Sequence, residues 1–278
     1  MINKLLSTLC IAALTVALSG QVRAQTHQFG SSLVLDGPLT QGAMLVGTTT
    51  PKNQIKLNDK SIKVASDGTF VIGFGRDSKL HHRLTVITAS ADTQSFELEL
   101  KKRKYNISRV TGISKKITHP SKKDQLRAAK DSKQVRAARN VWLDELHFTQ
   151  QFVLPVEGRI SGVYGSQRFY NGKAGRPHYG LDIARPTGTV VNAPADGVVR
   201  LFVPDMFYSG GTLIIDHGMG VSSTFLHLSA GLVKAGDRVK QGQPVAKIGS
   251  TGRSTGPHLD WRMNWLNQRI DPQLLLAK

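Results

Sequence analysis

Three short segments of the 278-residue chain carry histidine and carboxylate side chains at spacings that suit a metal ion. One is Arg-Pro-His-Tyr-Gly-Leu-Asp at 176–182, and another is Thr-Gly-Pro-His-Leu-Asp-Trp at 255–261. Between them, Thr-Phe-Leu-His-Leu-Ser at 224–229 places a histidine at the end of an apolar run. Imidazole nitrogen and carboxylate oxygen form a ligand set for zinc or a similar divalent ion. We therefore interpret the three segments as one metal site with accompanying catalytic histidines.

In the 176–182 segment, His178 and Asp182 are four residues apart, a spacing that would place them on one face of a helix. Pro177 and Gly180 argue against a helix, so we expect a loop that enters a strand, with Asp182 at its start. A half-buried carboxylate there needs a cation or hydrogen-bond partners. Taken alone, the pair fits a structural role as well as a ligand role.

In the 255–261 segment, His258 and Asp260 are two residues apart, so on a strand both side chains point to the same face. A surface strand with polar residues by chance is the alternative. His227 could be an ordinary core histidine, and its functional interpretation depends on the other two segments. We expect His217, in Asp-His-Gly, to lie in a turn.

The elements that must position these residues indicate a mainly β chain. Residues 26–105 are predicted to form a small β-sandwich-like domain, because short strand-like runs alternate with turn signals such as Ser-Asp-Gly at 66–68. Residues 152–278 are predicted to form a second β domain built from antiparallel hairpins. The strand-like runs are 32–35, 54–57, 61–64, 69–72, 84–87, 96–100, 212–216, 221–225 and 244–248.

Residues 106–150 are predicted to be a connector with a basic linker and a helix. Ser121 is placed to cap the helix, with Asp124 three residues on. The apolar stripe is weak until Val135 and Ala138 and continues to Trp142 and Leu146. We therefore expect a helix whose C-terminal half packs and whose N-terminal half is exposed.

Residues 1–24 look like a secretory signal peptide, with Lys4, a short apolar run and Val-Arg-Ala before the cleavage point. An uncleaved anchor helix is the alternative. Cleavage would leave a periplasmic or secreted protein with no stable membrane span and no cysteine, since Cys10 is the only one. The formal net charge of +18 favours a polyanionic partner. For an exported protein we expect a cell wall or membrane surface and no nucleic acid, because no nucleic-acid-binding motif is present.

Together, the three segments resemble those of the lysostaphin/LytM-type zinc metallopeptidases, which hydrolyse peptidoglycan. The resemblance covers about residues 152–272 and includes Pro-Ala-Asp-Gly-Val-Val at 194–199 and Val-Lys-Gln-Gly-Gln-Pro-Val-Ala at 239–246. It implies a LytM-type antiparallel β-sheet domain at 152–278 and one Zn²⁺ per chain.

Carried over by position, the resemblance makes His178 and Asp182 the first two zinc ligands and His227 and His258 the catalytic histidines. Asp260 stands where the family has a third histidine ligand. A carboxylate binds zinc at about 2.0–2.2 Å, close to the nitrogen distance. Two carboxylates make the ligand set more negative, so we expect a higher pH optimum or a preference for harder ions.

The resemblance implies an exported zinc metalloendopeptidase that hydrolyses peptide cross-links of bacterial peptidoglycan. The alternatives are a catalytically inactive LytM-type activator of cell wall amidases and a wall-binding module without activity. The expected partners are peptidoglycan and, for the activator, an amidase or regulatory protein. Arg168, Arg253 and Arg262 are candidates for contacts with substrate carboxylates.

Overall fold

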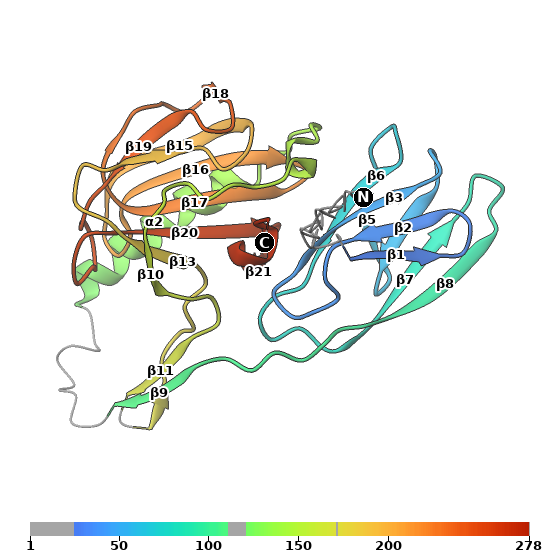
Figure 1. Ribbon diagram of the computed structural model, residues 1–278, viewed down its shortest axis with the longest axis horizontal. Coiled ribbons are helices and arrows are strands. Elements are labelled where there is room, and N and C mark those ends of the chain that lie inside the picture. The colour runs from blue at the N-terminus through green and yellow to red at the C-terminus, as the bar shows by residue number, and fades with distance from the viewer. Residues whose placement is uncertain (1–24, 111–120, 171, 278) are drawn as a thin grey trace, which may run out of the picture.

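A computed structural model describes residues 25–110, 121–170 and 172–277, so the predicted signal segment at 1–24 lies outside the described residues. Strands dominate the chain, as predicted, and one long helix lies in the connector (Figure 1). Among the described residues, no helix has the length and apolar character that crossing a bilayer would require. The domain ranges 26–105, 106–150 and 152–278 stay predictions.

The N-terminal part consists of two four-stranded antiparallel sheets. On β2 the alternate side chains Leu33 and Leu35 are fully buried, which is the pattern of a strand with one face in a core, and Phe70 of β6 belongs to the same core. One sheet has the order β1 (Thr26–Phe29), β2 (Leu33–Asp36), β3 (Met44–Thr49), β6 (Thr69–Gly73). The other has the order β5 (Lys60–Ile62), β4 (Gln54–Leu57), β7 (His81–Ile87), β8 (Thr93–Glu99).

The C-terminal part is built on a ten-stranded sheet whose pairings are antiparallel, as predicted. Its main path runs β10 (Arg159–Gly162), β13 (Leu181–Ala184), β20 (His258–Trp265), β17 (Val221–Gly231), β16 (Gly210–Gly218), β15 (Gly197–Met206), β18 (Arg238–Val239). Three further strands attach to it: β14 (Val190–Asn192), β19 (Pro244–Ile248) and β21 (Gln268–Ile270). A short 3-10 helix, η2 (Pro272–Leu275), follows the last strand.

The two faces of this sheet differ in chemistry. Phe225 and Trp261 are direct partners on β17 and β20 and are fully buried in the apolar core. Asp182 of β13 is the direct partner of Asp260 of β20, and the next polar residue of β20 is Arg262. Because directly paired residues share a face, this register gathers polar side chains on the face opposite the core.

The basic linker contributes a strand that the sequence did not predict. β9 (Ile107–Val110) pairs in parallel with β11 (Gln167–Tyr170), and β11 pairs with β12 (Lys173–Ala174). The resulting three-stranded sheet stands apart from the large sheet (Figure 1). Its pairing joins segments far apart in the chain, so no local pattern in the charged linker marks it.

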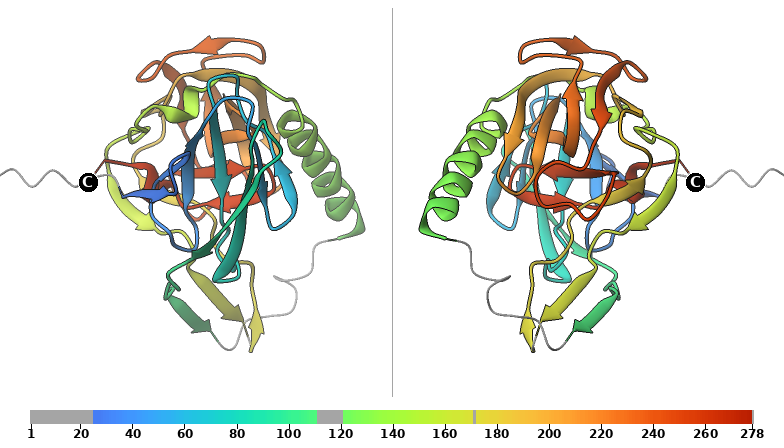
Figure 2. Two further views of the ribbon diagram at one scale, coloured as in Figure 1. Left: turned by 90° about the vertical axis from the view of Figure 1, so that its right-hand side faces the viewer. Right: turned by 90° about the vertical axis from the view of Figure 1, so that its left-hand side faces the viewer.

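The connector helix, α2 (Lys122–Arg139), lies along one side of the C-terminal part (Figure 2). Ser121 caps it as predicted, since its side chain accepts a hydrogen bond from the Asp124 N–H. The predicted apolar stripe was wrong beyond Ala138, because Asn140 caps the C-terminus and the chain leaves the helix before Trp142. Ala138 is the buried residue of the helix, which is consistent with packing at the C-terminal end.

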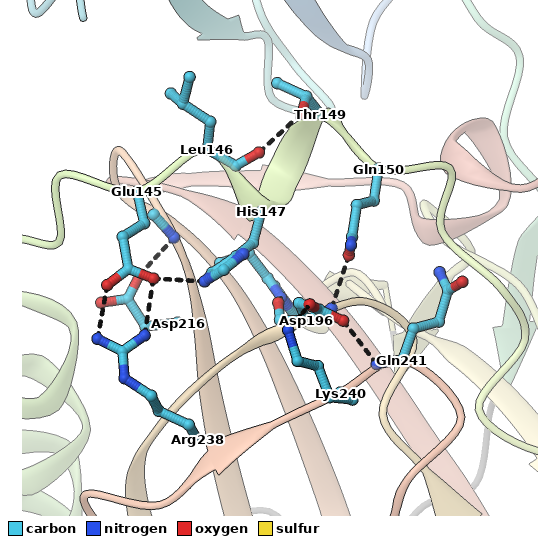
Figure 3. Close-up of polar contacts among 12 residues, drawn as sticks. Glu145, Leu146, His147, Thr149, Gln150, Asp196, Asp216, Arg238, Lys240 and Gln241 are labelled. Carbon is cyan, nitrogen blue, oxygen red and sulfur yellow. Dashed lines mark hydrogen bonds and ion pairs between the residues drawn. The ribbon is translucent and has the colours of Figure 1, made fainter.

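After α2 the chain is fastened to the C-terminal part by a cluster of ionic contacts (Figure 3). Glu145 accepts hydrogen bonds from both terminal nitrogens of Arg238, at 2.8 and 2.9 Å, and also contacts His147 of η1 (His147–Thr149). Gln150 accepts from the Asp196 N–H at 2.8 Å. These contacts hold residues 145–150 against the sheet edge and so fix where the connector reaches it.

His217 does not lie in a turn, as we expected, but is fully buried in β16. Its Nδ1 lies 2.7 Å from the Asp196 carbonyl oxygen, which can only accept, so Nδ1 carries the proton. Its Nε2 therefore accepts from the Ser223 hydroxyl, also at 2.7 Å. The turn begins only after this residue, because Met219 and Gly220 adopt positive φ angles.

Burial lowers the pKa of His217 from 6.5 to about 4, so its neutral form stabilises the fold. The unfolded chain binds a proton that the folded chain excludes, so this stability is complete above pH 6.5 and is lost as the pH falls toward 4. We expect a loss of about 3 kcal/mol in the free energy of unfolding over this range. Urea unfolding of wild type and His217→Gln at several pH values checks it, because the variant lacks this titration. Equal pH dependence in both proteins would refute the assignment.

Candidate metal centre

Three predicted ligand residues meet on the polar face of the large sheet. His178, Asp182 and Asp260 each offer a ligand atom, and these atoms lie within 4.8 Å of one another. The β13–β20 pairing sets Asp182 directly opposite Asp260, and the loop before β13 brings in His178. The sequence separates the two carboxylates widely, and the register alone brings them together.

The local chemistry of this cluster fits a cation. His178 Nε2 lies 3.1 Å from Asp182 Oδ1, which is an ion pair only when the imidazole is protonated. The geometry is not that of a hydrogen bond, and both atoms are buried without a hydrogen-bond partner. Buried polar atoms are nearly always paired because desolvation is costly. One imidazole nitrogen and two carboxylates suit zinc or a harder divalent ion.

Two glycines leave room for the carboxylates. A Cβ at Gly180 would collide with Asp260 Oδ1, and a Cβ at Gly162 would collide with Asp182 Oδ2. A larger residue at either position would force the neighbouring carboxylate to shift. The glycine of the Tyr-Gly-Leu-Asp motif therefore helps to define the position of Asp260, 80 residues further on.

Arg262 is bound to Asp260, a contact that the sequence did not predict. Its Nε lies 3.0 Å from both carboxylate oxygens, and its terminal nitrogen donates to Oδ2 at 2.6 Å. Burial alone would raise the pKa of Asp260, but the charge and hydrogen bonds of Arg262 lower it, so the carboxylate is ionised. Asp260 is thus kept in the form that can bind a metal, while Arg262 offsets part of its charge.

His227 and His258 stand side by side next to the ligands, with ring centroids 4.9 Å apart. Nδ1 of His227 donates to the Thr251 carbonyl oxygen, and Nδ1 of His258 donates to that of Gly256, both at 2.8 Å. Each neutral ring therefore presents Nε2 as a proton acceptor. Burial also lowers the pKa of His227, which favours its neutral form.

The backbone conformation of His227 is unusual for a histidine in a buried strand. Its φ angle is +63°, and the pairing of β17 is irregular around it. A positive φ is uncommon for a residue with a Cβ and tends to occur where function requires it. In this backbone conformation the imidazole lies beside that of His258.

Arg76 of the N-terminal part supports the loop that contains His178. The sequence did not predict this role. Arg76 is buried, and its Nε donates to the Gly165 carbonyl oxygen at 2.9 Å. The Gly165 N–H in turn donates to the His178 carbonyl oxygen at 2.8 Å. The ring of Tyr105 stacks on the Arg76 guanidinium at 4.5 Å. A contact between residues 89 apart thus positions the loop that carries the candidate ligand His178.

Replacing Arg76 by alanine should weaken metal binding about tenfold, in the range seen when residues that orient ligands are removed. The cause is loss of the Gly165 support, which lets the His178 loop move. Competition with a coloured chelator measures the affinity directly. Arg83→Ala, an exposed arginine of β7, is the matched control, and equal affinities for both variants would contradict the prediction.

Two arginines that we considered for substrate contacts have other surroundings. Arg253 stacks on the Tyr208 ring at 4.8 Å, and its N–H donates to the Tyr208 carbonyl oxygen. Arg168 lies in β11, opposite Ser108 of the linker strand. Both side chains are exposed, and the contacts described for each of them do not involve His178, Asp182 or Asp260.

Comparison with known proteins assigns this site to a family. Residues 176–272 match the model of peptidase family M23, and this stretch contains every residue of the cluster. The match is confined to this stretch, which is less than half of the chain, and there the resemblance to lysostaphin/LytM-type peptidases is confirmed.

Similar proteins agree with this assignment. The chain is 38% identical over 115 residues to the peptidoglycan DD-endopeptidase ShyA of Vibrio cholerae, which is 41% of this chain and 26% of ShyA. It is 36% identical over 124 residues to an uncharacterized metalloprotease of Haemophilus influenzae, covering 44% and 26% of the two chains. The match thus spans about a quarter of each of these relatives. The crystal structure of a candidate M23 peptidase from Pseudomonas aeruginosa has a TM-score of 0.67 and 27% identity, covering 86% of this chain and 95% of that one.

Proposed function

We propose that the protein is an exported zinc metallopeptidase that hydrolyses peptide cross-links of bacterial peptidoglycan. One observation carries the proposal. Ligand atoms of His178, Asp182 and Asp260 lie close together, and two of the buried atoms in this cluster have no hydrogen-bond partner. Two histidines lie beside the cluster, and the Nδ1 atom of each is already hydrogen-bonded to a backbone carbonyl oxygen. That combination offers a cation site and a proton acceptor within one small volume.

In this proposal, His178, Asp182 and Asp260 hold one zinc ion per chain. When bound, zinc supplies Lewis-acid polarisation of a peptide carbonyl and of water. His227 accepts a proton from the attacking water at Nε2, since its Nδ1 is occupied and its pKa is lowered. His258, with the same tautomer, orients the water through its Nε2 acceptor, and the proton accepted by His227 would pass to the leaving amine.

The substrate class is supported by similarity and by charge. ShyA is named as a peptidoglycan DD-endopeptidase, and the stretch of this chain that matches the M23 family model includes the candidate ligand segments. The formal net charge of +18 suits an anionic wall. The signal-like segment at 1–24 supports export to the periplasm or the exterior.

A second candidate function is activation of a cell wall amidase without catalysis. The observation that favours it is the pairing of Arg262 with Asp260, which places a cation on the third ligand. If Arg262 prevents metal binding, the domain would act as a binding surface. A partner amidase would then be required for any effect on the wall.

Incubation of the mature protein with purified sacculi separates the two functions. The peptidase should release soluble cross-link fragments, lose this activity with a chelator and regain it when zinc is supplied. A protein that releases nothing alone but accelerates a purified amidase would instead establish the second function. Release that persists after metal removal would contradict the proposed mechanism.

A further inference from the structure

Three buried side-chain polar atoms of the described residues lack a hydrogen-bond partner. Two of them, His178 Nε2 and Asp182 Oδ1, belong to the metal centre. The third is Nε of Arg139, the last residue of α2. Because buried polar groups are normally paired, two orphaned electron-pair donors point to a cation and an orphaned guanidinium N–H points to an anion.

Arg139 lies over the same face of the sheet as the metal centre. Its terminal nitrogen donates to the buried Thr224 Oγ1 at 2.7 Å, and Thr224 is the direct partner of Arg262 between β17 and β20. Directly paired residues project to one face, so Arg139 and Arg262 share it. Arg262 follows Asp260 by two residues, a step of about 7 Å along a strand.

A third guanidinium extends this group. Arg269 of β21 is the direct partner of Asn264 and donates to its Oδ1 at 2.9 Å. Asn264 lies two residues beyond Arg262, on the same face of β20. Arg262, Asn264 and Arg269 therefore continue the polar surface that begins at the metal ligands.

The electrostatics of the group favour a bound anion. Burial and the charges of Arg269 and Arg262 together lower the pKa of Arg139 to about 9, so at neutral pH it remains charged but unfavourably placed. Of the carboxylates in the metal centre, Asp260 is already bound by Arg262. With a divalent ion present, the region keeps an excess of positive charge that a ligand carboxylate would offset.

We propose that Arg139, with Arg262 and Arg269, forms an anion subsite beside the metal centre that binds a free carboxylate of the peptide substrate. A planar guanidinium presents paired N–H donors that match the two oxygens of a carboxylate. The identification of the ligand as a peptide carboxylate rests on the proposed function. Through Arg139, α2 of the connector takes part in substrate selection, although it lies outside the M23 match at 176–272.

Binding of a matched peptide pair to the full mature protein tests the subsite. The probes are a tripeptide ending in D-alanyl-D-alanine with a free carboxylate and the same tripeptide as its C-terminal amide, measured by calorimetry with and without zinc. Wild type should bind the carboxylate about tenfold more tightly, as expected for one charge-assisted bidentate contact. Arg139→Met should remove this preference and leave the affinity for the amide unchanged.

Arg136→Met is the matched control, because Arg136 lies on the exposed side of the same helix and should keep the full preference. If Arg139→Met does not fold, Thr224→Val removes the hydroxyl that anchors Arg139 while keeping its shape, and the preference should fall. Equal affinities in wild type, or a preference retained in Arg139→Met and in Thr224→Val, would overturn the subsite. A preserved preference in wild type without any hydrolysis of sacculi would refute the peptidase and leave the subsite standing.

Discussion

Replacing His258 by alanine should abolish nearly all hydrolysis of sacculi while the protein keeps its metal. His258 is not among the three predicted ligands, and its Nε2 lies 3.9 Å from Asp182 Oδ1, so it stands beside the ligand cluster. Loss of a positioned proton-transfer group typically costs about 10²–10⁴-fold in rate. Fragment release from sacculi and metal content, measured on the same preparation, check both parts.

His227→Ala should behave in the same way, because both rings present Nε2 to the same region. His147→Ala is the matched control, since it removes a histidine that contacts Glu145 and lies in the connector. Loss of metal in His258→Ala would show that this residue is a ligand. Full activity in that variant would exclude the two-histidine mechanism.

Replacing Asp260 by alanine should both release the metal and destabilise the metal-free fold. The variant loses a candidate ligand, and it leaves the half-buried Arg262 guanidinium without the carboxylate that binds it. Removing one partner of a buried ion pair typically costs about 3–5 kcal/mol, and partial exposure of Arg262 places this case near the lower end, at about 3 kcal/mol. Chelator competition and urea unfolding of the metal-free protein measure the two effects separately.

Asp260→His distinguishes the ligand role from the ion-pair role. Histidine restores a zinc ligand but removes the negative charge, so metal binding should persist while the metal-free protein remains less stable than wild type. If Asp260→Ala binds zinc as tightly as wild type, Asp260 is not a ligand. If its stability is unchanged, the ion pair with Arg262 contributes nothing to the fold.

The candidate ligand residues could be picked out from the sequence because each motif is local, and the resemblance to LytM-type peptidases joined them into one predicted ligand set. His258 and Asp260 alternate along one strand, and the Gly-Leu-Asp turn marks the start of another. The strands themselves follow from short apolar runs between turn residues. Their β13–β20 register, which sets Asp182 against Asp260, needs the three-dimensional pairing.

The residues that modify the site escaped prediction because their contacts are distant in sequence. Arg139 reaches Thr224 across 85 residues, and Arg76 reaches Gly165 across 89. From the sequence alone, an arginine near a helix end or in a turn is expected to be a solvated charge. Only the fold shows that Arg76 is buried and that the Nε atom of Arg139 is inaccessible to solvent. The prediction of a turn at His217 was wrong for a related reason. A hydrogen bond to the carbonyl oxygen of the distant Asp196 holds that histidine inside the sheet.

Elemental analysis of the purified mature protein, after zinc is supplied and excess removed, tests the central claim most directly. The arrangement of His178, Asp182 and Asp260 predicts about one zinc per chain, held through gel filtration and removed by a strong chelator. A protein that retains no zinc under these conditions, and no harder divalent ion in its place, would contradict a metal centre at these residues. The domain would then have to act on the wall through a partner.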